Sequence, residues 1–291
     1  VQGVVLRSAR GSRAGCAEQA DCDTQERQVM TAPMFSIVTP TWGRLDGRLE
    51  RCVASVSVQT FRDYEHIVVD DGSKDGTWEW LQEETLRNDR LRPLRIEHQG
   101  RVVARNEGMR AAQGKFIAWL DSDDAYDMMY LETFAYHIAE RPEVDLWVTG
   151  AVVHGIAKGG PDERYGGHTV PVWSTFRRPW VPEKGSLFNS GRVGTGMFVF
   201  RKRCLDATGY LPPWKNPMQV ADGFDEYLGL PPGTTGYGSA GPKGGRPKGW
   251  LGNPWGDDHA LYQALCLHFQ AHILVDKDRR DPPCLYIHYT R

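Results

Sequence analysis

The chain has 291 residues, of which 40% are hydrophobic and 25% are charged, and its formal net charge is −2. This length suits one large domain, or one domain with a small lobe, and the composition suits a globular protein with a sizeable core. A nucleic-acid binder usually has a basic excess, so the charge argues against that class. No stretch approaches 18 apolar residues, which argues against a membrane-spanning segment.

The first 33 residues differ from the rest of the chain. Residues 1–33 show no sustained periodicity, and we predict a disordered N-terminal extension that lies upstream of a natural start at Met34. They also lack the apolar core of a signal peptide. The six cysteines are scattered and form no C-x-x-C pair, as is typical of reduced thiols. We therefore expect a cytoplasmic protein, and peripheral association with a membrane stays open.

From Met34 onward, strands and helices are predicted to alternate. Strands are expected where short β-rich runs end in turn residues, and helices where apolar residues recur at helical spacing. The expected strands are 35–39 (ended by Pro40), 64–69, 94–98, 116–120 and 144–149, and the expected helices are 45–59, 77–86, 102–112 and 128–140. Ser73 or Asp75 is the expected N-cap of the second helix. This alternation predicts an α/β fold with a mostly parallel central sheet flanked by helices.

The second half of the chain is less regular. Residues 194–200 favour a strand, followed by a helix start near Arg201, and residues 257–269 favour a final helix. Between them, residues 211–256 are rich in Gly, Pro and Trp. A structureless segment of that length inside a domain is either functional or disordered.

Three carboxylates lie within four residues at Asp121-Ser122-Asp123-Asp124, directly after the expected strand 116–120. Ligands of such sheets bind at the carboxyl ends of the strands. Carboxylates this close repel one another, so an ordered turn that holds them calls for a compensating cation. Oxygen ligands suit Mg²⁺ or Mn²⁺, which can neutralise a diphosphate leaving group. The competing interpretation is an acidic loop that caps the next helix.

Two further acidic pairs stand at element ends. Asp70 and Asp71 close the second expected strand, where a carboxylate can bind a base edge or a ribose hydroxyl, although a tight turn accounts for them equally well. Asp257 and Asp258 open the last helix, where acidic residues are also favoured by the helix dipole. The functional interpretation of this second pair is a general base that deprotonates an acceptor hydroxyl.

Together these segments resemble family 2 glycosyltransferases with the GT-A fold. The matching stretches, in chain order, are Ser36–Thr41 with Arg44, Ser55–Phe61, Val68–Ser73 with Asp75–Thr77, Ala104–Gly108 and Gly114–Asp124. The resemblance covers about residues 35 to 150. It implies an inverting enzyme that transfers a sugar from a nucleoside-diphosphate sugar, with a UDP-sugar favoured, to an acceptor hydroxyl.

The resemblance also implies roles for individual residues in donor binding. Pro40, Thr41 and Asp71 would line the nucleobase pocket, with Arg44 near it, and Arg105 would lie near the donor nucleotide or phosphate. The acidic turn would hold Mg²⁺ or Mn²⁺. Asp121 and Asp123 would contact the ribose or the metal, and Asp123 or Asp124 would be the direct metal ligand.

Two implied roles fall in the second half of the chain. Asp258, followed by Leu261, fits the general base of a late acidic pair, with Asp257 in the position often held by Glu. His288 stands where some GT-A enzymes place a late metal-binding histidine. Residues 34–150 would then form the nucleotide-sugar-binding half, and residues 151–291 the acceptor-binding half with a Gly/Pro-rich insertion at 211–256.

Other functions remain open at this stage. A nucleotidyltransferase on a similar sheet would carry a Gly-rich, Arg-containing loop after the first strand, and Thr39–Arg44 does not fit that loop. A non-catalytic binding module and a retaining enzyme of the same fold are further alternatives. The acceptor could be a glycan, a lipid-linked precursor, a peptide or a small natural product.

Overall fold

The computed structural model describes residues 32–156, 171–176, 195–213, 223–231, 257–274 and 284–290. All but the last two residues of the predicted extension 1–33, and most of the predicted insertion 211–256, lie outside these residues. The helices and strands described all belong to one compact unit, Pro33–Arg291.

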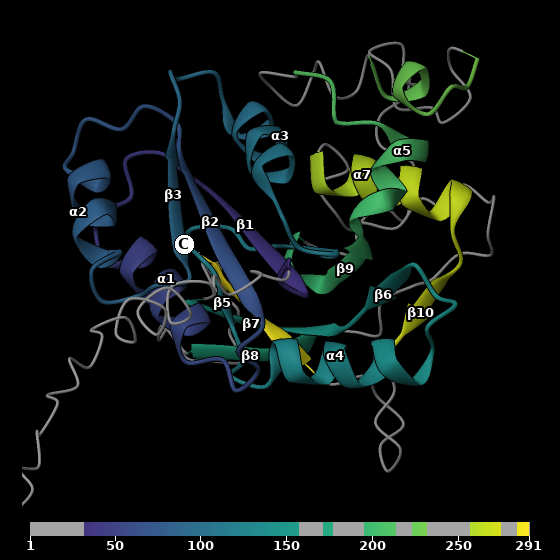
Figure 1. Cartoon of the computed structure of the whole chain (residues 1–291), viewed down its shortest axis with the longest axis horizontal. Coiled ribbons are helices and arrows are strands. Elements are labelled where there is room, and N and C mark those ends of the chain that lie inside the picture. The colour runs from purple at the N-terminus through teal and green to yellow at the C-terminus, as the bar shows by residue number, and fades with distance from the viewer. Residues whose placement is uncertain are drawn as a thin grey trace, which may run out of the picture. The chain divides into compact units, whose positions relative to one another are not determined.

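Strands and helices alternate through the first half, as the sequence predicts (Figure 1). In order they are β1 (Phe35–Thr41), α1 (Arg48–Ser57), β2 (Tyr64–Asp70), α2 (Thr77–Glu84), β3 (Leu91–Arg95), α3 (Arg101–Ala111), β4 (Phe116–Trp119), β5 (Ala125–Tyr126), α4 (Tyr130–Glu140) and β6 (Leu146–Val148). The N-cap of α2 is Gly76 rather than Ser73 or Asp75. Asp75 still assists the helix start, because its carboxylate accepts the Thr77 N–H at 3.2 Å.

The second half adds shorter elements. They are β7 (Gly150–Ile156), β8 (Pro171–Phe176), the 3₁₀ turn η2 (Thr195–Met197), β9 (Phe198–Arg201), the 3₁₀ turn η3 (Lys202–Cys204), α5 (Leu205–Thr208), α7 (Asp257–His268), β10 (Ala271–Ile273) and β11 (Cys284–Thr290). The strand expected from residue 194 therefore starts only at Phe198. In the 3₁₀ turn before it, the Gly196 carbonyl accepts the buried Tyr130 hydroxyl at 2.9 Å.

The central sheet has seven strands in the order β10-β6-β9-β4-β1-β2-β3. Its pairs are parallel except for β9, which runs antiparallel to both β4 and β6. This confirms the α/β fold with a mostly parallel sheet. From β1 the chain winds outward through β2 and β3 and returns as β4 on the other side of β1, so the order reverses there. Ligands of open α/β sheets bind outside the strand ends at such a reversal.

Helices cover both faces of this sheet (Figure 1). On one face Val68 packs with Leu49 of α1 and Leu81 of α2. Val69, its neighbour, points to the other face because side chains alternate along a strand, and there it meets α3. A Cβ at Gly108 of α3 would lie 2.4 Å from Val38, so this glycine allows close contact between α3 and β1.

Two prolines occupy strands without breaking the sheet. Pro93 lies in β3, an edge strand, where a missing N–H is tolerated; the expected strand 94–98 begins three residues earlier, at Leu91. Pro40 lies in β1, which was expected to end before it. The pairing of β1 with β4 covers only Phe35 to Val38, so Pro40 lies beyond the stretch that needs its N–H.

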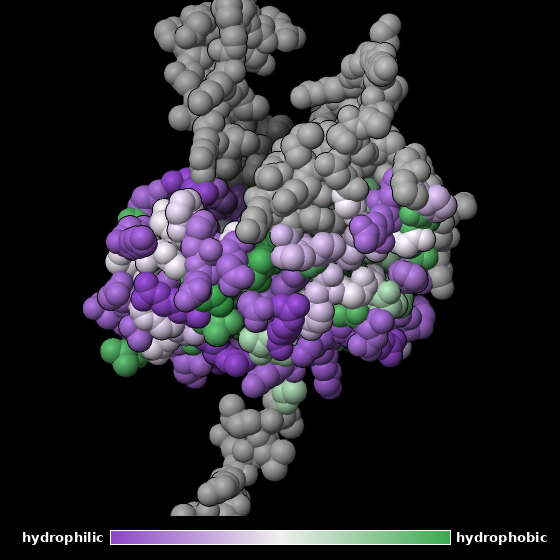
Figure 2. All heavy atoms as spheres, turned by 90° about the horizontal axis from the view of Figure 1, so that it is seen from above, coloured by the Kyte–Doolittle hydropathy of each residue, from purple (hydrophilic) through white to green (hydrophobic). Residues whose placement is uncertain are grey.

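A second sheet has the order β5-β11-β7-β8, and nothing in the sequence predicted it. It begins immediately after the acidic turn, because β5 starts at Ala125. Hydrophilic residues dominate the described surface in Figure 2, with apolar residues in small groups between them. Among the described helices, none is both long and apolar enough to cross a membrane.

Candidate functional site

A pocket of about 270 Å³ opens at the carboxyl ends of β1, β2 and β4. Its lining residues come from the end of β1 and the loop after it, the residue after β2, the β3–α3 connection, the first turn of α3 and the acidic turn after β4. They are Pro40, Thr41, Trp42, Arg44, Asp71, His98, Gly100, Arg101, Ala104, Asp121, Ser122 and Asp123. Six of the predicted donor-binding residues thus lie around one cavity, at the point where the strand order reverses.

The loop after β1 is anchored to the loop after β2. The Gly43 N–H donates to Ser73 Oγ at 2.9 Å, and the Leu45 N–H donates to Asp75 Oδ2 at 3.3 Å. Asp70, which is fully buried, accepts the Ser73 N–H at 3.0 Å and so holds that second loop in turn. The wall formed by residues 40–44 is therefore held by one half-buried and one exposed hydrogen bond to a loop that is itself fixed by a buried one.

Asp71 lines the same pocket beside this wall. Its carboxylate accepts the N–H groups of Gln99 at 2.8 Å and Gly100 at 2.9 Å, and His98 Nδ1 lies 2.9 Å from it. The side chain is 3% exposed, so these donors compensate the burial of its charge. Nearby, the Thr41 hydroxyl is buried but has no hydrogen-bond partner among the described residues. A buried hydroxyl in a pocket wall is available to a polar ligand.

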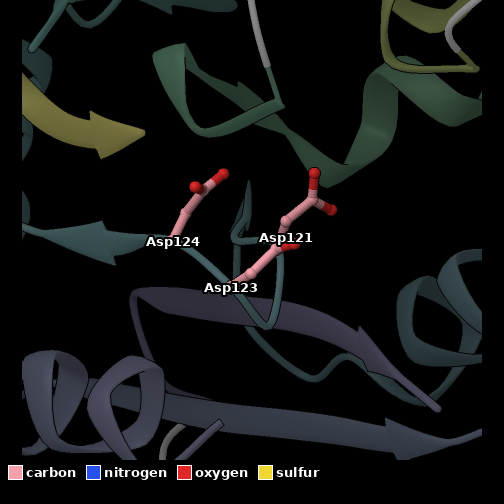
Figure 3. A group of neighbouring side chains, drawn as sticks. All are labelled: Asp121, Asp123 and Asp124. Carbon is pink, nitrogen blue, oxygen red and sulfur yellow. The ribbon is translucent and has the colours of Figure 1, made fainter. Parts of the chain in front are cut away.

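The three carboxylates of Asp121, Asp123 and Asp124 project from the turn after β4 (Figure 3). One oxygen of each lies within 4.8 Å of the others. The turn is closed by the Asp124 N–H, which donates to the Asp121 carbonyl at 3.0 Å. Such a set of carboxylate oxygens could hold a divalent cation. Burial raises the pKa of the neighbouring Cys52 thiol, and the charges of the three aspartates raise it further.

Arginine side chains at the acidic turn already supply part of the positive charge for which the sequence predicted a metal ion. Arg105, 1% exposed, donates from Nη2 to Asp121 Oδ1 at 2.5 Å and to Thr195 Oγ1 at 3.2 Å. Its guanidinium also lies 4.7 Å from the centre of the Trp119 ring. Arg105 is not a lining residue of the pocket. It supports Asp121 from the protein interior, and the close approach of α3 at Gly108 places it there.

Asp123 has arginine contacts of a more exposed kind. Arg44 Nη2 lies 3.6 Å from Asp123 Oδ2, with both side chains about a quarter exposed. Arg51 of α1 donates to the Asp123 main-chain carbonyl at 2.8 Å. Arg44 therefore links the loop after β1 to the acidic turn across the pocket, and a cation bound by Asp123 would compete with it.

The predicted base and the late histidine are described by their backbones alone. Helix α7 begins at Asp257, so Asp257 and Asp258 form its first turn, as expected. In β11, Ile287 pairs with Ala125 and Tyr286 with Tyr126 in an antiparallel ladder. One residue further along that register stand His288 and Asp124. The backbone of His288 thus runs beside the acidic turn; the side chains of these three residues lie outside the described part.

Two residues of the pocket wall, Trp42 and His98, and one residue behind the acidic turn, Arg51, were not predicted from the sequence. Trp42 falls inside the segment Thr39–Arg44, and an aromatic residue between two predicted donor-binding residues was a usable signal. His98 was assigned to the end of a strand, yet it lies beyond β3 and faces Asp71. Arg51 carries no local signal, since only the fold brings α1 to the acidic turn.

The chain is similar in sequence to known glycosyltransferases. Residues 36–203 match the model of the family described as "Glycosyl transferase family 2", which is more than half of the chain. The chain therefore belongs to glycosyl transferase family 2, as the motifs implied. Its sheet and flanking helices are those of the GT-A fold.

Individual relatives are similar over part of their length. Glycosyltransferase AglE of Haloferax volcanii is 34% identical over 197 residues, which is 62% of this chain and 64% of AglE. The protein provisionally named as teichuronic acid biosynthesis glycosyltransferase TuaG of Bacillus subtilis is 37% identical over 110 residues, 38% of this chain and 43% of TuaG. The chain thus spans less than half the length of TuaG.

The crystal structure of residues 1–349 of TarS from S. aureus has a similar fold. The TM-score is 0.55 at 18% identity, with 88% of this chain and 60% of the TarS chain covered. At that identity the likeness concerns the fold alone.

Proposed function

We propose that this protein transfers a sugar from a nucleoside-diphosphate sugar to an acceptor hydroxyl, with inversion at the anomeric carbon. One observation carries the proposal. The acidic turn, the Asp71 carboxylate and the unpartnered Thr41 hydroxyl face one pocket, so a single ligand with a polar base and a charged diphosphate could meet all of them. The membership in glycosyl transferase family 2 supports the same ligand class.

The base end of the donor lies against the loop after β1. Thr41 and Asp71 recognise polar atoms of the base or ribose, because both are buried and offer hydrogen-bonding capacity in the wall. Pro40 contributes an apolar surface beside them. Among donors, a UDP-sugar is the first to test, since a TarS crystal structure contains UDP-GlcNAc, with a TM-score of 0.53 at 20% identity.

The diphosphate end lies at the acidic turn. Asp123 and Asp124 would hold Mg²⁺ or Mn²⁺, with Asp121 contacting the ribose or the same cation, because hard carboxylate oxygens fit these ions. When bound, the cation would act as a Lewis acid that stabilises the charge of the leaving diphosphate. His288 is a further ligand in this proposal, supported by the β5–β11 register that brings its backbone beside Asp124.

The general base stands in the first turn of α7. Asp258 takes the proton from the acceptor hydroxyl as that oxygen attacks the anomeric carbon, and Asp257 stands beside it in the sequence. A base placed opposite the leaving group gives a single displacement and therefore inversion. Such a base contributes about 10²–10⁴-fold to the rate.

A donor screen tests the proposal. The purified protein is incubated with UDP-, GDP- and dTDP-sugars, with Mn²⁺ or with EDTA, and release of the nucleoside diphosphate is measured. We expect release from one nucleotide class, dependent on the divalent cation. Proton NMR of the transferred sugar then reads the anomeric configuration. Metal-independent release would remove the cation from the proposal, and retention of configuration would remove the single displacement.

A further inference from the structure

His98 contacts two parts of the pocket wall that come from different strands. Its Nδ1 lies 2.9 Å from Asp71 Oδ2 and 3.1 Å from the Asp71 carbonyl oxygen. Its ring stacks on the Trp42 indole, with ring centres 4.5 Å apart and planes 20° from parallel. Trp42 follows β1 and Asp71 follows β2, so one imidazole connects the two loops at the base end of the pocket.

These contacts assign the tautomer of the histidine. Both neighbours of Nδ1 are oxygen acceptors, so Nδ1 carries the proton in the neutral ring. The neutral imidazole therefore donates to Asp71 and also presents a flat face to Trp42. No change of protonation is needed for either contact.

The backbone around His98 is built to fit closely against Asp71. Gly72 has a φ of +71°, and a Cβ on it would lie 3.0 Å from the main-chain nitrogen of His98. A larger residue at position 72 would therefore push the segment at His98 away. The next two residues, Gln99 and Gly100, donate their N–H groups to the Asp71 carboxylate. Residues 98–100 thus wrap around this one side chain.

Two features of this arrangement remain available to a ligand, namely acceptor capacity on the Asp71 carboxylate and an exposed aromatic face. A carboxylate has roughly four lone-pair sites, and the N–H groups of Gln99 and Gly100 use two of them. The hydrogen bond of His98 Nδ1 goes to the Asp71 main-chain carbonyl, and the same nitrogen lies 2.9 Å from Asp71 Oδ2. Beside the acceptor capacity that remains lies the Trp42 indole, which is 57% exposed. A flat aromatic surface next to a charged acceptor suits a flat heterocycle that carries an N–H group. Nucleobases such as uracil have this chemistry.

We propose that His98 is a positioning residue for the nucleobase of the donor. It holds the Asp71 carboxylate and the Trp42 indole in a fixed relative orientation, which reduces the ordering that the pocket must undergo when a nucleotide binds. The inference rests on the proposed function, because it assigns His98 to the base end of the same donor pocket. His98 acts through Asp71 and Trp42, so its loss changes donor binding rather than the chemical step.

Two substitutions separate the two contacts. His98→Phe keeps a flat ring against Trp42 and loses the donor to Asp71, whereas His98→Asn keeps a donor and loses the ring. UDP, GDP and dTDP are titrated by calorimetry in the presence of Mn²⁺, and initial rates are measured against the sugar donor. We expect each variant to raise Kd and KM about 5–10-fold, corresponding to about 1–1.4 kcal/mol, with kcat within about twofold of the wild type.

Matched controls use the exposed His268 at the end of α7. His268→Phe and His268→Asn make the same chemical changes away from the pocket, and we expect both to leave Kd unchanged. A double-mutant cycle adds Trp42→Leu to His98→Asn. Because the two residues act as one unit, the second change adds little to the first.

The outcomes separate this inference from the proposed function. If the wild-type protein binds none of the three nucleoside diphosphates, the proposed function fails. If it binds one of them, and both His98 variants bind it with the wild-type Kd and an unchanged melting temperature, the positioning role is overturned and the proposed function stands. A fall in kcat with unchanged KM also overturns it. Should His98→Phe fail to fold, His98→Asn decides alone.

Discussion

The two ends of the pocket hold their carboxylates in different ways. At the base end, main-chain N–H groups of Gln99 and Gly100 surround Asp71. At the acidic turn, arginine side chains hold the carboxylates: Arg105 donates to Asp121, and Arg44 lies 3.6 Å from Asp123. Main-chain donors are fixed by the fold, whereas a guanidinium on a long side chain can move aside.

This difference separates two kinds of recognition. Asp71 is a carboxylate whose position is fixed by main-chain donors, which suits a directed hydrogen bond to a nucleobase. The acidic turn holds several carboxylates, and at least one of them, Asp123, has a partly exposed cationic partner that a metal could displace. We therefore expect substitutions at the acidic turn to change metal-dependent binding, and substitutions at Asp71 to change binding with and without the metal.

The largest expected effect lies outside both ends of the pocket. Asp258→Asn removes the proposed base, and we expect turnover to fall about 10²–10⁴-fold. Calorimetry with the nucleoside diphosphate and Mn²⁺ should give near-normal affinity, because neither end of the pocket is altered. Unchanged turnover would remove Asp258 from the role of base. Asp206→Asn, at an exposed position of α5, serves as the control.

The next effect tests the acidic turn. Asp124→Ala removes a proposed metal ligand, and we expect nucleotide binding in Mn²⁺ to weaken about 10–100-fold, the range seen when groups that support metal sites are lost. Binding in EDTA should not change. Titrations under both conditions make the comparison, with the exposed Asp89→Ala as control. Equal losses in Mn²⁺ and EDTA would contradict the metal role.

A smaller effect is expected at the base end. Asp71→Asn keeps the shape of the side chain and removes its charge, so we expect about tenfold weaker binding of the nucleoside diphosphate, since hydrogen bonds to charged groups are worth about 1.5–3 kcal/mol. The loss should be the same in Mn²⁺ and in EDTA. A loss confined to Mn²⁺ would show that Asp71 belongs functionally to the acidic turn, and the contrast between the two ends would be wrong.

The smallest effect concerns the competition between Arg44 and a cation. Arg44→Gln removes a partly exposed ion pair, and such pairs are worth about 0.2–1 kcal/mol. We therefore expect Mn²⁺ alone, without nucleotide, to bind up to about fivefold more tightly. Electron paramagnetic resonance counts free Mn²⁺ directly, and Arg44→Lys serves as the charge-preserving control. Weaker Mn²⁺ binding would show that Arg44 supports the site instead of competing for it.

The sequence predicted those parts of the site that depend on local order. Asp71 and Asp121 each follow a run of buried strand residues, and parallel strands bring their carboxyl ends to one edge of the sheet, so their meeting could be inferred. The family motifs covered the same stretch. The alternating helices and strands of residues 35–148 follow from the same local patterns.

The parts of the site and of the fold that were not predicted depend on contacts between segments far apart in the sequence. The burial of Arg105 depends on Thr195, 90 residues later in the chain, and on the close approach at Gly108. His98 could not be placed, because the strand before it was expected three residues too late. The second sheet pairs β5 with β11, two elements separated by most of the second half, and no local pattern specifies that pairing.

The position of β9 also bears on how this protein folds during synthesis. β4 and β6 do not pair with each other, since Phe198–Arg201 lies between them and pairs with both. Until Arg201 has been synthesised, β4 has one unpaired edge and β6, whose other neighbour is β10, has two, and such edges promote aggregation. A fragment that ends at residue 150 would keep the whole acidic turn but would lack β9, so the edges of β4 and β6 that pair with β9 would stay exposed. Residues 34–150, the proposed donor-binding half, therefore need the later half of the chain to complete their sheet.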